Sequence, residues 1–345
     1  MSDETVSFEE NFEEPENDVF HISRPMTEKE AFFFNKGIKD VTQEELRLKY
    51  LSDKNSDLID CAIPIARYNP IPEYMPEREF LPGLRKGRVG IISASGSTGK
   101  SFFCLQLAMA AAAGGLPVFG NYLPLLQERI RVAYLIGEED THDIDRRIRS
   151  VCAYYNKMFN HGLDVWKPML EHLLLIPMQA HPPCVFDPKG PTNGVARIEK
   201  LCDDFHPELL IIDPLCHFHR ADENNNGEMT HVMQLFTQIA AVKNCAVLIC
   251  HHMGKGSILS GQGALQQATR GASAIVDAAR WVMSMTKPIK GGEKDLKTED
   301  GKKVLVAFPK LNNCAPIEPF TLYRGPGGVL DITDPYGGSF NGNCR

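Results

Sequence analysis

A glycine-rich stretch, "IISASGSTGKSFF" from Ile91 to Phe103, holds the residue types best suited to chemistry in this sequence. A phosphate-binding loop places consecutive backbone N–H groups at a helix start, with a lysine for the outer phosphates and a hydroxyl for Mg²⁺. The predicted nucleotide ligands are Ser95, Gly96, Ser97, Thr98, Gly99, Lys100, Ser101 and Phe102. Ala94 replaces the first glycine of the usual pattern but removes no phosphate ligand, so we predict a working site for ATP.

Hydrolysis of ATP also needs a carboxylate near Mg²⁺ and a group that orients the attacking water. Asp213 ends the apolar run "LLIID" and is predicted, together with Ser101, to hold Mg²⁺. Glu138 follows "YLIG" and is favoured as the catalytic carboxylate, because ligands of open α/β sheets collect at strand ends. Glu139 and Asp140 stay as alternatives, since the first turn of a helix also favours acidic residues.

Two histidines, His251 and His252, end the apolar run "CAVLICHH", so a third strand brings a polar group to the same edge. We expect one of them to contact the γ-phosphate, and an ordinary hydrogen-bonding role is an equal alternative. His217 and His219 lie near Asp213 in the sequence. Neither a helix-spaced pair of histidines nor a cysteine partner supports a zinc site there.

The surrounding segments alternate between apolar runs and helical stretches. Strands are predicted over "VGIIS", "RVAYLIG", "LLLIPM", "LLIID" and "CAVLICHH". Helices are predicted over "KSFFCLQLAMAAAAG", "DTHDIDRRIRSVCAYYNKM" and "MTHVMQLFTQIAAVK". This alternation predicts an α/β fold with buried parallel strands and helices on both faces of the sheet. Further on, "ASAIVDAARWVMSM", "KVLVAFPKLN" and "FTLYRGPGGVLDIT" are predicted as strands joined by hairpins, with "KPIKGGEKDLKTEDGKK" as an exposed loop.

The charge is concentrated at the N-terminus of this 345-residue chain, whose formal net charge is -7. Residues 1–18 carry eight acidic side chains and no lysine or arginine. This composition predicts a disordered acidic tail over 1–22 that suits a protein partner, and it argues weakly against a general nucleic-acid coat. A capping box from Thr42 to Glu45 predicts a helix within an extension and linker over 23–79. The main domain is predicted over 80–333, with a flexible tail over 334–345.

The ten cysteines are scattered without a C-x-x-C pair, so they are expected to be reduced core thiols. The chain has no apolar run of about eighteen residues and no secretory signal, so we expect a cytoplasmic protein without a membrane partner.

Several segments together resemble the RepA-type family of plasmid replicative helicases. The phosphate loop is followed, in the family's order, by "YLIGEED", "LLIIDPLCHFHRADENNNGEM", "LICHHMGKG", "QQATRGASAIVDAARW", "PKLNNCAPIEPF" and "GGVL". The resemblance runs from about Phe80 to about Ile332. It implies a RecA-like core and a hexameric ring with ATP at the subunit interfaces and single-stranded DNA in the channel. The implied function is an ATP-driven helicase or translocase for replication of a plasmid or another mobile element.

Residue roles follow from this resemblance. It makes Lys100 and Ser101 the P-loop ligands, Glu138 the catalytic carboxylate, Asp213 the Mg²⁺-linked acid and His251 the γ-phosphate sensor.

The resemblance also makes Arg270 an arginine finger donated to the neighbouring subunit's nucleotide. Such a finger stabilises transition-state charge and makes hydrolysis depend on assembly. Arg280 is the alternative finger, and Arg270 could instead form a structural ion pair. Related ring helicases carry a Lys-x-Arg pair on a late strand, where this sequence reads Lys310-Leu311-Asn312. Lys310 is therefore a candidate for the interface, and the second cation of the pair is missing.

DNA contacts are expected from Arg220 in "HRADENNNGEM" and Lys255 in "MGKGSILSGQGALQQA". Neither segment interleaves basic and aromatic residues as a strong single-strand platform does, but a six-fold ring would repeat both charges around its channel. The alternatives are that both loops are merely solvated, and that the chain is an ATP-switched regulatory or assembly module without translocation. A phosphotransferase is disfavoured, because no arginine-rich lid follows the core.

Overall fold

The computed structural model describes residues 79–114, 116–123, 128–159, 167–252, 273–287 and 302–333. The chain divides into two compact units, 1–76 and 77–345, and all the described residues belong to the second. The predicted acidic tail, the capping-box helix, most of the linker, the C-terminal tail and most of the charged loop lie outside the described residues. The same holds for Arg270 and Lys255.

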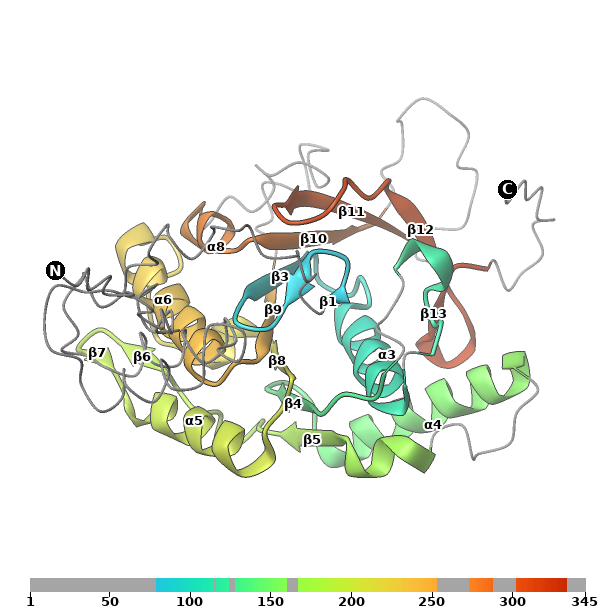
Figure 1. Cartoon of the computed structure of the whole chain (residues 1–345), viewed down its shortest axis with the longest axis horizontal. Helices are drawn as coiled ribbons and strands as arrows, with labels where there is room; N and C mark the ends of the chain where they lie inside the picture. The colour runs from blue at the N-terminus through green and yellow to red at the C-terminus, as the bar shows by residue number, and fades with distance from the viewer. Residues whose placement is uncertain are drawn as a thin grey trace, which may run out of the picture. The chain divides into compact units, whose positions relative to one another are not determined.

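A nine-stranded sheet forms the centre of the second unit, in the order β13-β12-β11-β10-β3-β9-β8-β4-β5 (Figure 1). Its strands are β3 (Val89–Ala94), β4 (Val132–Ile136), β5 (Leu173–Pro177), β8 (Leu209–Asp213), β9 (Ala246–His252), β10 (Trp281–Thr286), β11 (Lys303–Leu311), β12 (Phe320–Arg324) and β13 (Leu330–Asp331). Neighbouring strands from β10 to β5 pair in parallel, and those from β10 to β13 pair antiparallel. The predicted α/β class with a parallel core and C-terminal antiparallel strands is confirmed.

Helices cover both faces of this sheet. They are α3 (Lys100–Ala113), α4 (Thr141–Phe159), α5 (Asn193–Phe205), α6 (Asn226–Val242) and α8 (Ser273–Ala278). The short 3-10 turns are η4 (Gly120–Tyr122), η6 (Lys167–Glu171), η7 (Leu215–His217) and η9 (Pro326–Gly328). Two small hairpins lie outside the main sheet. They are β1 (Glu79–Leu81) with β2 (Leu84–Arg85), and β6 (Phe186–Asp187) with β7 (Gly190–Pro191). Helices α3 and α4 pack on one face, and α5, α6 and α8 pack on the other (Figure 1).

Alternation along β8 decides which face receives Asp213. Ile211 belongs to the apolar cluster on the α3 side, and Ile212 belongs to the cluster on the α6 side. Because successive side chains of a strand point to opposite faces, Asp213 returns to the α3 side. The strands are apolar on both faces because helices bury both, which is why they read as continuous apolar runs in the sequence.

Two expectations for individual elements need correction, and two further elements were missed. The segment "ASAIVDAARW" is not one strand, since Ser273–Ala278 forms helix α8 against α6 and β10 begins only at Trp281. Strand β5 is not fully buried, because it lies at the sheet edge and pairs only with β4. Helix α5 and the β6–β7 hairpin were not predicted. The signal for α5 was its cap, where the Thr192 side chain accepts a hydrogen bond from the Gly194 N–H.

Within the described ranges, every helix is too short or too polar to span a lipid bilayer.

Candidate functional site

A buried ion pair joins the phosphate loop to strand β8. Strand β3 ends at Ala94, the loop follows, and α3 begins at Lys100, whose Nζ lies 3.1 Å from Oδ1 of Asp213. The two side chains are only 6% and 2% exposed. Tyr134 of β4 donates its hydroxyl hydrogen to the other carboxylate oxygen, Oδ2, at 2.7 Å.

The mutual attraction keeps both groups of this pair charged. Burial opposes the charge on each, but the carboxylate of Asp213 outweighs it and raises the pKa of Lys100. Burial acts on Asp213 in the same way, and Lys100 together with the Tyr134 hydrogen bond lowers the pKa of that carboxyl. The lysine is therefore held as a cation beside the loop.

The P-loop itself is a tight turn built by Ser95 and Thr98. The Thr98 hydroxyl donates to the Ser95 carbonyl oxygen at 2.7 Å, and the Thr98 N–H donates to the same oxygen at 3.3 Å. Gly99 has φ of 105°, in the left-handed region that favours glycine. Its carbonyl accepts the first helical hydrogen bond of α3 from the Phe103 N–H, at 2.9 Å. The loop thus enters the helix in the form that presents N–H groups to an anion.

The predicted Mg²⁺ ligands come together at the start of α3. The Ser101 side chain lies near enough to the Asp213 carboxylate to help lower the pKa of that carboxyl. A hydroxyl and a carboxylate are hard oxygen donors of the kind that Mg²⁺ takes. Lys100 Nζ and Asp213 Oδ1 contact each other without the alignment of a full hydrogen bond, so both retain capacity for phosphate or metal. The residues present therefore fit a magnesium–nucleotide ligand.

Glu138 lies just beyond β4 and faces two imidazoles. Its Oε1 is 3.5 Å from Nε2 of His252 and 3.7 Å from Nε2 of His217, and its side chain is 45% exposed. The close approach of His217 depends on Gly137, where a Cβ would lie 2.9 Å from the Cβ of His217. The Gly137 N–H also donates to the Asp213 carbonyl oxygen at 2.7 Å, which aligns the ends of β4 and β8.

The two acidic residues after Glu138 are directed at helix α4. Glu139 forms an ion pair with Arg147 of α4. Burial raises the pKa of Glu139 to about 7, although Arg147 acts to lower it. Asp140 accepts a hydrogen bond at 2.8 Å from the Asp143 N–H and so caps the helix. Of the three, only Glu138 is close to His217 and His252.

The alternation in β9 separates the two histidines that end it. Cys250 packs on the α3 side, so His252 shares the face of the P-loop and His251 points to the other face. His251 is 5% exposed, and burial, followed by the charge of Lys100, lowers its pKa to about 4. The resemblance assigned phosphate sensing to His251, which points away from the face of the P-loop, whereas His252 lies beside Glu138.

The predicted interface and DNA-contacting residues that are described contact other elements of the fold. Lys310 of β11 donates to the carbonyl oxygens of Val276 and Asp277, at 2.9 and 3.1 Å, and so caps helix α8. Arg280 is exposed just beyond that helix. Arg220 is exposed as well, and its backbone N–H is bound to the Phe186 carbonyl of β6 at 2.8 Å.

Two arginines beside the P-loop were missed by the sequence reasoning. Arg324 of β12 donates from Nη2 to the carbonyl oxygens of Thr98 and Ser97, at 2.7 and 3.4 Å. The guanidinium of Arg147 lies 4.8 Å from the centre of the Phe102 ring. The predicted helix that follows Glu138 contains Arg147, which is a signal that could have found it, but no local pattern signals Arg324.

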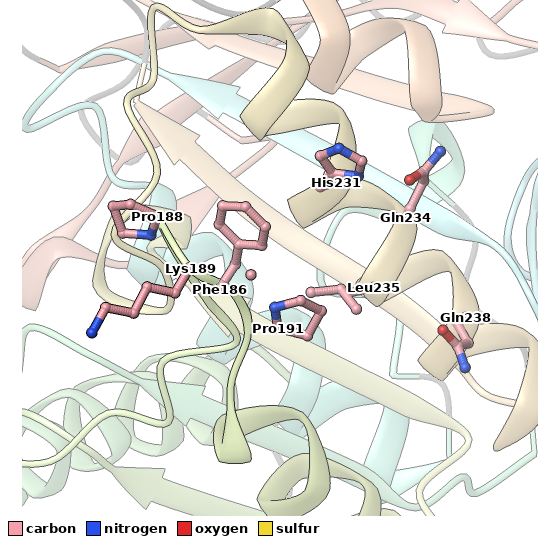
Figure 2. A pocket seen from close by; sticks show the side chains of 9 residues that line it. Phe186, Pro188, Lys189, Pro191, His231, Gln234, Leu235 and Gln238 are labelled. Atoms are coloured by element: carbon pink, nitrogen blue, oxygen red, sulfur yellow. The ribbon is translucent and has the colours of Figure 1, made fainter.

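A groove of about 450 Å³ lies elsewhere, between the β6–β7 hairpin and α6. Figure 2 shows residues of the hairpin across from residues of the helix. Its lining residues are Phe186, Pro188, Lys189, Gly190, Pro191, His231, Gln234, Leu235 and Gln238. None of these is a predicted nucleotide ligand, so the groove is separate from the P-loop site.

The cysteines in the described segments are free thiols, and Cys104, Cys202, Cys245 and Cys250 are buried as expected. Cys216 is exposed instead. Over these same segments, no group of three or more His, Cys, Asp or Glu side chains is arranged to hold a metal ion.

Comparison with solved structures gives distant likenesses. The RadB recombinase is 12% identical, with a TM-score of 0.46 over 73% of this chain and 93% of that one. A DnaB-like replicative helicase, solved with its interactions with primase, is 13% identical, with a TM-score of 0.49 over 72% of this chain and 58% of that one. The flagellar accessory protein FlaH from Methanocaldococcus jannaschii is 19% identical, with a TM-score of 0.42 over 72% of this chain and 90% of that one. At these scores the likenesses carry no functional conclusion.

The comparison with protein families is more decisive. The model of the AAA domain family matches residues 70–257, which is more than half of the 345-residue chain and includes the P-loop and strands β3, β4, β8 and β9. The chain therefore belongs to the AAA domain family.

Proposed function

We propose that this chain hydrolyses ATP and uses the energy to move along single-stranded DNA, as a hexameric RecA-like helicase or translocase in plasmid or mobile-element replication. The observation that carries the proposal is the convergence of Lys100, Asp213 and Glu138. The ion pair of the first two measures 3.1 Å, and Glu138 extends from the neighbouring strand end toward two imidazoles. ATP hydrolysis requires a cation that binds phosphate, an acid linked to the metal and a base, and Lys100, Asp213 and Glu138 would supply these three groups.

In the proposed reaction the loop N–H groups and the Lys100 ammonium hold the β- and γ-phosphates. Ser101 and Asp213 would bind Mg²⁺, which neutralises charge on the phosphate oxygens when present. Glu138 orients a water molecule and accepts its proton as the water oxygen attacks the γ-phosphorus. The bond from that phosphorus to the bridging oxygen breaks, and ADP leaves with the electron pair.

His252 is the residue that we assign to sensing this change. Its Nε2 lies 3.5 Å from Glu138 Oε1, so its contacts depend on whether the γ-phosphate and the water are in place. The chain that follows His252 contains Lys255, the predicted DNA contact. In the proposed ring, Arg270 of one subunit would reach the nucleotide of the next, since Lys310 is engaged with the carbonyl oxygens of α8.

The test is the rate of ATP hydrolysis against protein concentration, with and without single-stranded DNA, at low and at moderate salt. We expect a rate that rises steeply with concentration, because the site is shared between subunits, and a DNA stimulation that salt weakens. A rate indifferent to DNA at both salt levels would refute translocation. It would favour the ATP-switched regulatory module, which needs a protein partner and no DNA.

Two matched variants test the assignment of the base. Glu138→Gln should lower kcat by about 10²- to 10⁴-fold, the usual effect of losing a general base, while ATP still binds. Glu139→Gln should lower kcat much less, because Glu139 faces Arg147. Equal losses of kcat in the two variants would contradict the assignment.

A further inference from the structure

Arg324 ties the C-terminal antiparallel part of the sheet to the P-loop. It is the last residue of β12, and its backbone N–H donates to the Lys302 carbonyl oxygen at 2.7 Å. Its guanidinium leaves the strand and contacts the loop, with Nη2 2.7 Å from the Thr98 oxygen and 3.4 Å from the Ser97 oxygen. A rigid strand and a planar guanidinium therefore constrain a loop that has no regular backbone pairing of its own.

The bond to Thr98 fixes the direction of one particular N–H group. In a planar trans peptide the carbonyl and the N–H point in opposite directions. Holding the Thr98 oxygen toward Arg324 therefore turns the Gly99 N–H to the opposite side of the loop. The preceding N–H, that of Thr98, is already bound to the Ser95 oxygen within the turn. The Gly99 N–H is thus the one that the arginine orients.

Glycine at position 99 is what permits this contact. A Cβ on Gly99 would lie 2.9 Å from Arg324 Nη2 and 3.2 Å from a methyl carbon of Leu330. The arginine thus occupies the space that a side chain would need, and the φ of 105° is open to glycine at little cost.

The charges around the loop also favour a polyphosphate. Burial, and then the nearby charge of Arg147, lowers the pKa of Arg324. Arg147 itself is held by Glu139 and by the Phe102 ring. Lys100 is the third cation next to the same turn. Bringing like charges together in a partly buried place is unfavourable, and an anion bound nearby relieves that repulsion.

We propose that Arg324 is a positioning residue of the P-loop, which holds the Thr98–Gly99 peptide so that its N–H points at the nucleotide phosphates. It acts through the backbone and sets the affinity for the polyphosphate part of the nucleotide more than for the nucleoside. This inference rests on the nucleotide binding in the proposed function, and it does not depend on DNA or on ring assembly.

The experiment measures nucleotide affinity in the full chain. A fluorescent methylanthraniloyl derivative of ADP is titrated into the wild type, Arg324→Gln, Arg324→Lys and a control, and is then displaced with ADP or AMP. The control is Lys303→Gln, which removes a cation from the same hairpin, where Lys303 Nζ lies 5.3 Å from the Tyr323 ring. Unfolding temperatures without nucleotide are recorded for all four proteins.

We expect Arg324→Gln to weaken ADP binding by about tenfold, the effect of losing one charged hydrogen bond. AMP binding should change by less than about threefold, since AMP lacks the β-phosphate that the loop N–H groups surround. Arg324→Lys should recover part of the loss, because an ammonium can still donate to one carbonyl but lacks the fork that spans two. Lys303→Gln should bind both nucleotides as the wild type does.

Three results would overturn the inference: unchanged ADP affinity in Arg324→Gln, an equal loss for ADP and AMP, or full recovery by Arg324→Lys. The last would mean that charge alone matters. If Arg324→Gln unfolds at a much lower temperature, the ratio of ADP to AMP affinity in Arg324→Lys decides the question. Failure of the proposed function would be seen separately, as hydrolysis that DNA does not stimulate, with the affinity difference intact.

Discussion

Replacing Asp213 by asparagine removes one charge from the buried ion pair and keeps the size of the side chain. The asparagine oxygen can still accept the Tyr134 hydrogen bond, which measures 2.7 Å in the wild type. The substitution therefore measures what the charge of Asp213 alone contributes to stability. It leaves the Lys100 ammonium, 6% exposed, without the carboxylate 3.1 Å away that keeps it ionised.

The expected loss of stability is large for a change of one atom. Removing one partner of a buried ion pair costs about 3–5 kcal/mol, because the other charge stays buried without compensation. At about 2–4 °C per kcal/mol for a domain of this size, the unfolding temperature should fall by about 6–20 °C. The matched control is Asp203→Asn, whose carboxylate pairs with Lys243 at 2.8 Å but is 62% exposed. A surface pair contributes at most about 1 kcal/mol.

The loss of stability in Asp213→Asn should also depend on pH in a definite direction. In the wild type the pKa of Asp213 is lowered and that of Lys100 is raised, so the stability from the pair persists between about pH 4 and about pH 10. Asp213→Asn removes the largest of the effects that raise the pKa of Lys100, so burial lowers that pKa. The native lysine then loses its proton more readily than the unfolded one, so the deficit relative to the wild type should shrink as pH rises from about 7 to about 9.

Thermal and urea unfolding of both variants, without nucleotide, at these two pH values provides the assay. The reasoning is refuted if Asp213→Asn loses no more stability than Asp203→Asn. A deficit that grows as pH rises would refute the assignment of the cost to a buried, unpaired ammonium.

Two further predictions concern the same region. Gly99→Ala should destabilise the protein by about 1–3 kcal/mol, because its φ is 105° and a Cβ there would contact Arg324. The control Gly96→Ala should destabilise it less, because nothing lies within 4 Å of a Cβ at that position. Equal unfolding temperatures of the two variants would contradict this prediction. The pKa of Glu139 is raised from 4.5 to about 7, so the native state binds that proton more tightly than the unfolded state does. The free energy of unfolding should therefore fall as pH rises across this range, and the profile of Glu139→Gln should be flatter. An unchanged pH profile in Glu139→Gln, measured by unfolding over a pH series, would count against this prediction.

The sequence was sufficient for residues whose role follows from local order. Lys100 and Ser101 begin a helix directly after a strand and a glycine turn, and Asp213 ends a strand that must lie in the same parallel sheet. The ends of parallel strands share one edge, so these residues were expected together, and Lys100 Nζ lies 3.1 Å from Asp213 Oδ1.

Choices between adjacent residues could not be made in this way. Glu138 and Glu139 are one residue apart, and what separates them is the ion pair with Arg147, eight residues beyond Glu139 on another element. His251 and His252 point to opposite faces of the sheet, so the choice between them depends on which face carries α3. That is a property of the assembled sheet, and the apolar run before them reads the same on both faces.

Long-range contacts and short elements were also beyond the sequence pattern. Helix α8 has six residues, too few for helical periodicity to separate it from a buried strand. Arg324 meets Thr98 across 226 positions of the chain, and no spacing rule connects an arginine at the end of a late strand to a phosphate loop.

The position of β3 in the sheet has a consequence for how the chain is made. Strand β3 precedes every other strand of the nine-stranded sheet in the sequence, yet its two neighbours are β9 and β10, with Ile91 paired to Ile249 on one side and to Val282 on the other. At roughly 5–20 residues per second, a ribosome takes about 10–40 s to travel from β3 to the end of β10. Throughout that interval the apolar strand that leads into the P-loop lacks at least one of its two partners. A nascent chain therefore cannot complete its nucleotide site early, and β3 is the strand of this sheet that a chaperone would have to shield for longest.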